Sequence, residues 1–127
     1  MPKQTLALHP ERFCIHSLDH DAPIPNEVLQ APIFFISKTE DELSVVVPDN
    51  VAIQSEASDG NWRAMEVLGP LSLSMVGIMA SIGSVFAKAN VSIFVVSTFD
   101  TDYFLIKHND LAAAVDALRG DGYKVTE

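Results

Sequence analysis

The feature of this 127-residue sequence that most limits its fold is a repeated hairpin pattern. The segment IFFISKTEDELSVVVPDN at 33–50 can be set against IFVVSTFDTDYFLIKHND at 93–110, an offset of 93 − 33 = 60 residues that matches Thr39 with Phe99. Each copy has an apolar run, a short acidic break and an alternating apolar run, which is typical of a β-hairpin. The repeat therefore predicts two similar units, divided near the turn-rich SEASDGN at 55–61.

The second unit has a complete pattern of alternating strands and helices. The expected elements are a strand at 62–68, a helix from about Leu71 to Ala89, a hairpin at 91–108, a helix at 111–120 and a strand at 123–126. This order predicts one antiparallel sheet with both helices on a single face, the ferredoxin-like βαββαβ arrangement. Asn90 and Gly120 are expected to end the two helices, and Asp110 to begin the second one.

The first unit is expected to be a degenerate copy of the second. It has strands near 5–8 and 12–18, one helical turn in PNEVLQ and the hairpin, but no room for a 19-residue helix. The fold class is therefore α+β with antiparallel sheets, divided into residues 1–60 and residues 61–127.

The long helix of the second unit carries two stripes. Its apolar stripe predicts packing against the sheet and consists of Leu71, Met75, Ile78, Ile82, Val85 and Ala89. A second stripe, expected to face water or a second helix, consists of Ser74, Gly77, Ser81, Ser84 and Lys88. Because a lone chain would leave this helix surface uncovered, we expect a homodimer with close helix or edge-strand contacts.

Composition excludes several classes of partner. Acidic residues outnumber basic ones 17 to 8, a formal charge of −9, whereas nucleic acid or an anionic membrane needs a basic face. Cys14 is the single cysteine, so no intramolecular disulfide can form, which fits a reducing cytoplasm. The first residues lack the apolar run of a signal peptide, and Gly69-Pro70 with four serines disfavours a membrane span over the uncharged 67–87.

Two motifs carry a family resemblance that covers nearly the whole chain. The run GPLSLSMVGI at 69–78 and the segment STFDTDY at 97–103 resemble the ACT domain. The likeness is closest to small bacterial tandem-ACT proteins related to the CASTOR-type cytosolic arginine sensors. ACT domains bind amino acids between domains and regulate other activities. The resemblance implies a ligand site formed by Gly69, Pro70, Leu71, Ser72, Ser74, Val76, Gly77, Ile78, Thr98, Phe99 and Asp102.

The chemistry of these positions can be argued independently of the family. A glycine before a helix lets the backbone approach a ligand, and the first helical turn offers unpaired N–H groups to a carboxylate. Asp102 would bind an ammonium group, Phe99 would cover an aliphatic stem, and the Thr98 hydroxyl would donate or accept. The alternative stays open that serines cap the helix, and Asp100 and Asp102 merely shape the turn.

Topology adds an expectation about where a ligand sits. In a regular unit of this order, the first strand–helix loop and the hairpin tip at 99–102 are expected to lie at opposite ends of the sheet, so that one ligand bridges two units, within a chain or across a dimer.

Other candidate sites are less favoured. His16 and His20 with Asp19 and Asp21 resemble a metal cluster, but a spacing of four does not bring two imidazoles together on a strand. Cys14 has no evident histidine and acid partners, so it is expected to be a buried structural thiol. No catalytic fingerprint is present, and we expect no metal, no cofactor and no enzymatic activity.

The sequence thus predicts a cytoplasmic sensor that binds a small amino acid or a relative and regulates a partner protein. The rival is an interaction module that has lost ligand binding. A small enzyme is a third possibility, but it would need a nucleophile or metal constellation.

Overall fold

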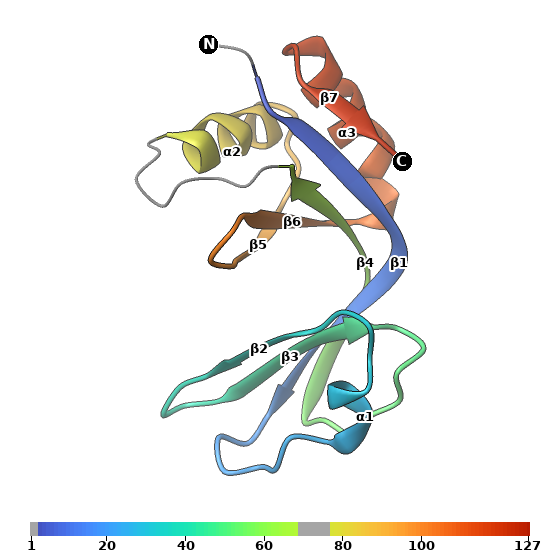
Figure 1. Cartoon of the computed structure of the whole chain (residues 1–127), viewed down its shortest axis with the longest axis vertical. Helices are drawn as coiled ribbons and strands as arrows, with labels where there is room; N and C mark the ends of the chain where they lie inside the picture. The colour runs from blue at the N-terminus through green and yellow to red at the C-terminus, as the bar shows by residue number, and fades with distance from the viewer. Residues whose placement is uncertain (1–2, 69–76) are drawn as a thin grey trace. The chain divides into compact units, whose positions relative to one another are not determined.

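The structure is a computed structural model that describes residues 3–68 and 77–127 (Figure 1). In these ranges the elements are β1 (Thr5–Leu18), α1 (Asn26–Leu29), β2 (Phe35–Lys38), β3 (Leu43–Pro48), β4 (Ala57–Val67), α2 (Ile78–Lys88), β5 (Phe94–Ser97), β6 (Asp102–Lys107), the 3₁₀ turn η1 (His108–Asp110), α3 (Leu111–Gly120) and β7 (Lys124–Thr126). The expected α+β class with antiparallel strand pairs is confirmed.

The chain forms two compact units whose division differs from the expected one. One unit combines Met1–Pro10 with Arg63–Glu127, and the other is Glu11–Trp62. The second boundary lies within two residues of the expected split at 60, but the first ten residues belong with the C-terminal part. The reason is strand pairing: β7 pairs in parallel with the start of β1, from Thr5 opposite Lys124 to Ala7 opposite Thr126.

The unit formed by residues 1–10 and 63–127 has its strands in the order β7-β1-β4-β6-β5. The start of β1 lies beside the end of β4, where the Leu68 amide donates to the Thr5 carbonyl at 2.8 Å. Both helices pack on one face of these strands, as expected. Their shared core consists of Leu6, Leu8, Met65, Val67, Ile82, Val85, Phe86, Val91, Phe104, Ile106, Ala114, Leu118, Tyr123 and Val125.

The apolar stripe of the long helix is confirmed where the structure describes it. Ile82 and Val85 are buried, and Ile78 and Ala89 pack against the core. Leu71 and Met75 lie outside the described residues. The prediction omitted Phe86, which is fully buried and packs against Phe104 in a tilted arrangement, with ring centroids 5.7 Å apart.

The start of α2 corrects the expected helix of 71–89. Gly77 has φ 83° and ψ −3°, which is left-handed backbone, so a right-handed helix cannot pass through it. The helix therefore begins at Ile78. Its first backbone bond joins the Ser81 amide to the Gly77 carbonyl at 2.8 Å.

Both long helices end with the same local motif. After α2, Asn90 has φ 61° and the Val91 amide donates to the Phe86 carbonyl at 2.9 Å. After α3, Gly122 has φ 95° and the Tyr123 amide donates to the Leu118 carbonyl at 3.0 Å. These are Schellman motifs, in which a residue with left-handed backbone reverses the chain so that the amides after the helix donate hydrogen bonds to the last helical carbonyls. The expected ends at Asn90 and Gly120 are therefore confirmed within two residues.

In the unit Glu11–Trp62, β3 pairs with both β2 and the second part of β1. The beginning of β4 also joins β1 there, since the Glu56 amide donates to the Ser17 carbonyl at 3.0 Å. The strands expected near 5–8 and 12–18 are one continuous strand, β1. The only helix within 11–62, all of which the structure describes, is the four-residue α1. The core consists of Leu18, Val28, Leu43, Val45 and Val47.

Candidate functional site

The end of β4 and the tip of the second hairpin lie at the same end of the sheet. The hydroxyl of Thr101 donates a hydrogen bond to the carbonyl of Val67, the last residue of β4. β4 and β6 are neighbours in the sheet. Because this bond joins the start of β6 to the end of β4, the two strands run in opposite directions. The expectation that the strand–helix loop and the hairpin tip lie at opposite ends is therefore wrong. One ligand could therefore contact both the strand–helix loop and the hairpin tip of a single unit, and the geometry does not require a second unit.

The two hairpins correspond at an offset of 59 residues rather than 60. Each has a four-residue tip that begins with a threonine, 39–42 in the first and 98–101 in the second. Thr39 donates through its amide to the Glu42 carbonyl at 2.9 Å and accepts from the Glu42 amide at 3.2 Å. Thr98 has the same two bonds with Thr101, at 2.8 and 3.2 Å.

With an offset of 59 instead of 60, each residue of the second hairpin corresponds to a different residue of the first hairpin than the sequence alignment gave. A slip of one residue exchanges the two faces of a strand, so the correct pairing decides which side chains correspond. Thr98 matches Thr39, and Phe99 matches Glu40. Asp102, which begins β6, matches Leu43, which begins β3.

Asp102 therefore occupies a position that is core-facing in the other hairpin. Leu43 is 1% exposed and belongs to the core of its unit. Side chains alternate along a strand, so Asp102 lies on the same face as Phe104, which contacts the core beneath α2 and α3. Asp102 is half-buried there. Burying a carboxylate at such a position costs free energy unless a partner group pairs with it. A ligand group could be that partner, which makes Asp102 a candidate binding residue.

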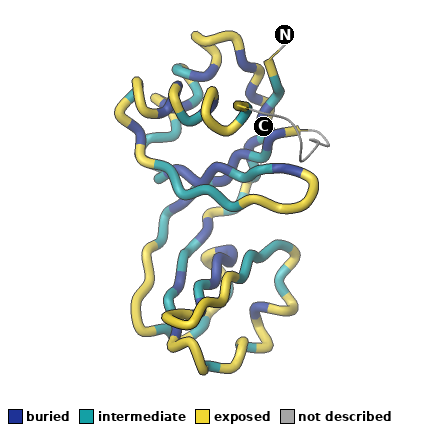
Figure 2. The backbone as a smooth tube through the Cα atoms, turned by 90° about the vertical axis from the view of Figure 1, so that its left-hand side faces the viewer, coloured by how far each residue is buried: buried dark blue, intermediate teal, exposed yellow. Residues whose placement is uncertain are grey.

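Phe99 and Thr98 have different environments within the tip. Phe99 is 78% exposed and is available for contact with another molecule. Most of the tip of this hairpin is exposed, as the colouring of the backbone in Figure 2 shows. The Thr98 hydroxyl donates to the Thr101 carbonyl at 3.1 Å, so its only proton is used inside the turn. Thr98 therefore shapes the tip and retains just one acceptor lone pair for a ligand.

α2 begins at Ile78 after Gly77. Its start lies on the same side of the unit as the tip of the β5–β6 hairpin (Figure 1). Among the described residues, no side-chain hydrogen bond caps this helix at its N-cap Gly77, which has no side chain to accept from the amides of the first turn. Gly77 is exposed, and an added Cβ there would meet nothing within 4 Å. The remaining expected site residues, Gly69, Pro70, Leu71, Ser72, Ser74 and Val76, lie outside the described residues.

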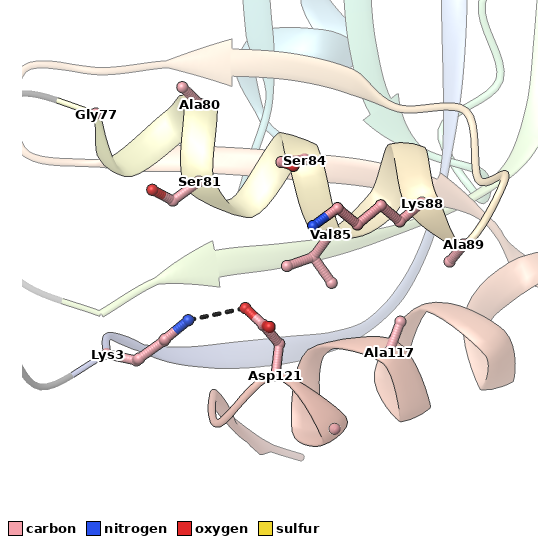
Figure 3. A pocket seen from close by; sticks show the side chains of 11 residues that line it. Lys3, Gly77, Ala80, Ser81, Ser84, Val85, Lys88, Ala89, Ala117 and Asp121 are labelled. Carbon is pink, nitrogen blue, oxygen red and sulfur yellow. Dashed lines mark hydrogen bonds and ion pairs between the residues drawn. The ribbon is translucent and has the colours of Figure 1, made fainter.

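The small and polar stripe of α2 lines a groove. The expected members Gly77, Ser81, Ser84 and Lys88 all border a pocket of about 690 Å³ between α2, the end of α3 and the segment before β1 (Figure 3). Across the groove, Lys3 and Asp121 form an ion pair at 2.8 Å. Their mutual hydrogen bond raises the pKa of Lys3 and lowers the pKa of Asp121. Sequence alone gave no signal for this pair, which joins residues 118 apart.

A hydrogen-bonded polar cluster on the sheet was also missed by sequence reasoning. The imidazole Nε2 of His9 lies 3.0 Å from Oε1 of Glu66, and its ring centroid lies 5.8 Å from that of Tyr103. Burial, followed by the neighbouring Glu66 carboxylate, raises the pKa of Tyr103. These residues come from three strands, so no local motif marks them.

The residues of the disfavoured metal cluster are brought together only in part. Asp19, His20 and Asp21 have candidate ligand atoms within 4.8 Å of one another. His20 already faces a carboxylate with each ring nitrogen, at 3.2 Å for Asp19 and 3.3 Å for Asp21. His16 lies elsewhere in its unit: it is 7% exposed, and its Nδ1 lies 2.9 Å from the Ser55 hydroxyl.

Cys14 has the environment of a structural thiol. Its side chain is half-buried, and burial raises the pKa of the thiol. A raised pKa keeps the sulfur protonated and poorly nucleophilic at neutral pH.

Comparison with known proteins identifies the family. The model of the ACT domain matches residues 57–120, half of the chain. This chain belongs to the ACT domain family. The resemblance predicted from the sequence is confirmed, and the matched segment includes β4, α2, the second hairpin and α3.

Among curated proteins, this ACT chain is similar to cytosolic arginine sensors for mTORC1. The rat protein is 27% identical over 117 residues and the human protein 26% identical over 120 residues, each match covering 84% of this chain. The chain spans about a third of their length, 35% of each.

Solved structures share the fold over nearly the whole chain. An Agrobacterium tumefaciens protein has a TM-score of 0.89 and 30% identity, covering 98% of this chain and 93% of that one. The regulatory subunit of aspartate kinase from Thermus thermophilus has a TM-score of 0.67 and 14% identity, covering 94% and 98%. A Vibrio cholerae protein of unknown function has a TM-score of 0.72 and 14% identity, covering 94% and 91%. Within the described residues, every helix is too short or too polar to cross a membrane.

Proposed function

We propose that this ACT-domain chain is a cytoplasmic sensor that binds a small amino acid and regulates a partner protein, without catalytic activity of its own. The observation that carries the proposal is Asp102. The two hairpin tips have the same backbone hydrogen bonds, yet the second copy has a carboxylate where the first has a core leucine. A substitution that gives up core packing is best explained by a gain in binding.

Three groups at one end of the sheet match the parts of an amino acid. The carboxylate of Asp102 would bind the ammonium group through a charge-assisted hydrogen bond. The uncapped first turn of α2 after Gly77 would accept the α-carboxylate through its amides and its positive dipole end. The exposed ring of Phe99 would cover the aliphatic part of the ligand. Family membership and the similarity to arginine sensors support this assignment.

We further propose that the chain is a tandem of two ACT units with a degenerate first copy, and that it forms a homodimer. The matched hairpin tips support the tandem. The surface of α2 supports the dimer: its exposed residues include only one charge, Lys88, in a chain of net charge −9. Sedimentation equilibrium should give twice the chain mass, and Ser84→Glu should shift the protein toward monomer. A wild-type protein that sediments as a monomer would contradict the dimer.

The test of the sensor is a thermal-shift screen with each of the twenty standard amino acids. One of them should raise the melting temperature saturably, because a ligand at about 100 times its Kd adds about 2.7 kcal/mol of stability. Asp102→Ala should abolish this rise. Asp100→Ala is the matched control, since it removes the same charge from the exposed tip two residues away, and it should retain the rise.

The exposure of Phe99 favours a second candidate, an interaction module that binds a protein surface and no amino acid. If none of the twenty amino acids shifts the melting temperature, the sensor proposal fails and the interaction module becomes the better reading. If Asp100→Ala and Asp102→Ala weaken the shift equally, the specific role proposed for Asp102 is wrong.

A further inference from the structure

Thr101 is one of two buried polar residues among those described, at 8% exposure. All of its polar groups are paired. Its amide donates to the Thr98 hydroxyl at 3.2 Å, and its carbonyl accepts from the Thr98 amide at 2.8 Å and from the Thr98 hydroxyl at 3.1 Å. Its own hydroxyl donates to the Val67 carbonyl. The tip of the second hairpin is thereby fastened to the end of β4.

The first hairpin shows that the turn itself does not require this bond. At the matching position it has Glu42, which is exposed, while the backbone bonds of the tip are the same. The hydroxyl bond to a neighbouring strand is thus an addition of the second copy. It occurs next to Asp102, which is the other addition at this end of the sheet.

We propose that Thr101 is the positioning residue of the ligand site. Its bond to Val67 fixes the tip against the sheet, and so sets where Phe99 and Asp102 stand relative to the start of α2. Holding binding groups in place before the ligand arrives removes an ordering cost from binding. Thr101 itself donates no hydrogen bond to a ligand, because its amide and hydroxyl protons are both used within the protein. This inference rests on the proposed amino-acid sensor.

The experiment compares Thr101→Val, which keeps the shape and loses the donor, with Thr101→Ser, which keeps the hydroxyl. For the amino acid that stabilises the wild type, calorimetric titration should show about ten-fold weaker binding for Thr101→Val. Thr101→Ser should bind within about two-fold of the wild type. Amide exchange at residues 98–102 in the unliganded protein should be faster in Thr101→Val and close to wild type in Thr101→Ser.

A control variant separates positioning from stability. Thr39→Val removes a tip hydroxyl from the hairpin that lacks Phe99 and Asp102, and it should change the melting temperature without changing the Kd. If Thr101→Val lowers the melting temperature but leaves the Kd and the amide exchange as in the wild type, Thr101 is merely structural and the inference is overturned. A wild type that binds none of the twenty amino acids would instead remove the proposed function itself.

Discussion

Asp102 begins β6 at the position that Leu43 has at the start of β3. The two residues follow tips of equal length with equivalent backbone hydrogen bonds, and each opens a strand whose alternate residues enter a core. One copy therefore keeps an apolar contact that the other replaces with a charge. Leucine is the side chain that core packing favours at this position, and the carboxylate is the one that the proposed ligand site uses.

Replacing Asp102 with the residue of the first copy should trade function for stability. Asp102→Leu is expected to raise the free energy of unfolding by about 1 kcal/mol, because a half-buried leucine adds apolar contact where a carboxylate adds a desolvation cost. Urea denaturation measures this change. The same variant should lose the amino-acid-dependent rise in melting temperature. A clear loss of stability would show that Asp102 has a structural partner and would contradict the binding role.

Two phenylalanines five residues apart should behave in opposite ways. Phe104→Ala is expected to lower the free energy of unfolding by about 3–5 kcal/mol, because Phe104 is fully buried between the sheet and α2. Phe99→Ala should change stability by less than about 0.5 kcal/mol, because its ring is mostly exposed. The ligand-induced thermal shift should decrease in Phe99→Ala. Equal losses of stability in urea would contradict the placement of the tip.

Two glycines at the end of α3 form a matched pair. Gly122→Ala should cost about 1–2 kcal/mol, since φ 95° is strained for any residue with a Cβ although nothing lies within 4 Å of that position. Gly120→Ala has the same open space and ordinary helical backbone, so it should be neutral or stabilising by up to about 1 kcal/mol. Thermal denaturation of both variants distinguishes backbone strain from crowding. A destabilised Gly120→Ala would contradict this account of the helix end.

His16 should make the protein less stable in acid. Burial lowers its pKa below the ordinary value of 6.5, so the unfolded chain takes up a proton more readily than the folded one. Its neutral form is present in both states above that value, and stability is lost as the pH falls below it, by at most about 1.4 kcal/mol per pH unit. His16→Gln should reduce the difference in unfolding free energy between pH 8 and pH 5.5. If His16→Gln keeps the full pH dependence of the wild type, groups other than His16 cause the loss of stability in acid.

Local pattern alone was enough for most of the secondary structure, whereas the candidate binding residues of the second hairpin came from the resemblance to the ACT domain and stay a prediction. Alternation predicted the strands of both hairpins, and α3 lies at the predicted residues 111–120, although Asp110 forms no side-chain cap hydrogen bond at its start. The stripe of Gly77, Ser81, Ser84 and Lys88 was visible in the sequence because helical spacing puts these residues on one side. These features depend on neighbours within a few positions, so the chain reveals them without a fold.

Long-range pairing decided the rest. The first strand joins the C-terminal unit because β7 pairs with its start, a contact between residues more than a hundred positions apart. The register of the two hairpins depends on hydrogen bonds across each tip, and the one-residue error of the sequence alignment concealed the match between Asp102 and Leu43. The bond from Thr101 to Val67 places the hairpin tip at the end of β4 rather than at the opposite end of the sheet. Antiparallel packing of strands that are distant in sequence determines which ends meet, and for that reason only the tertiary structure could show that the hairpin tip lies beside the end of β4.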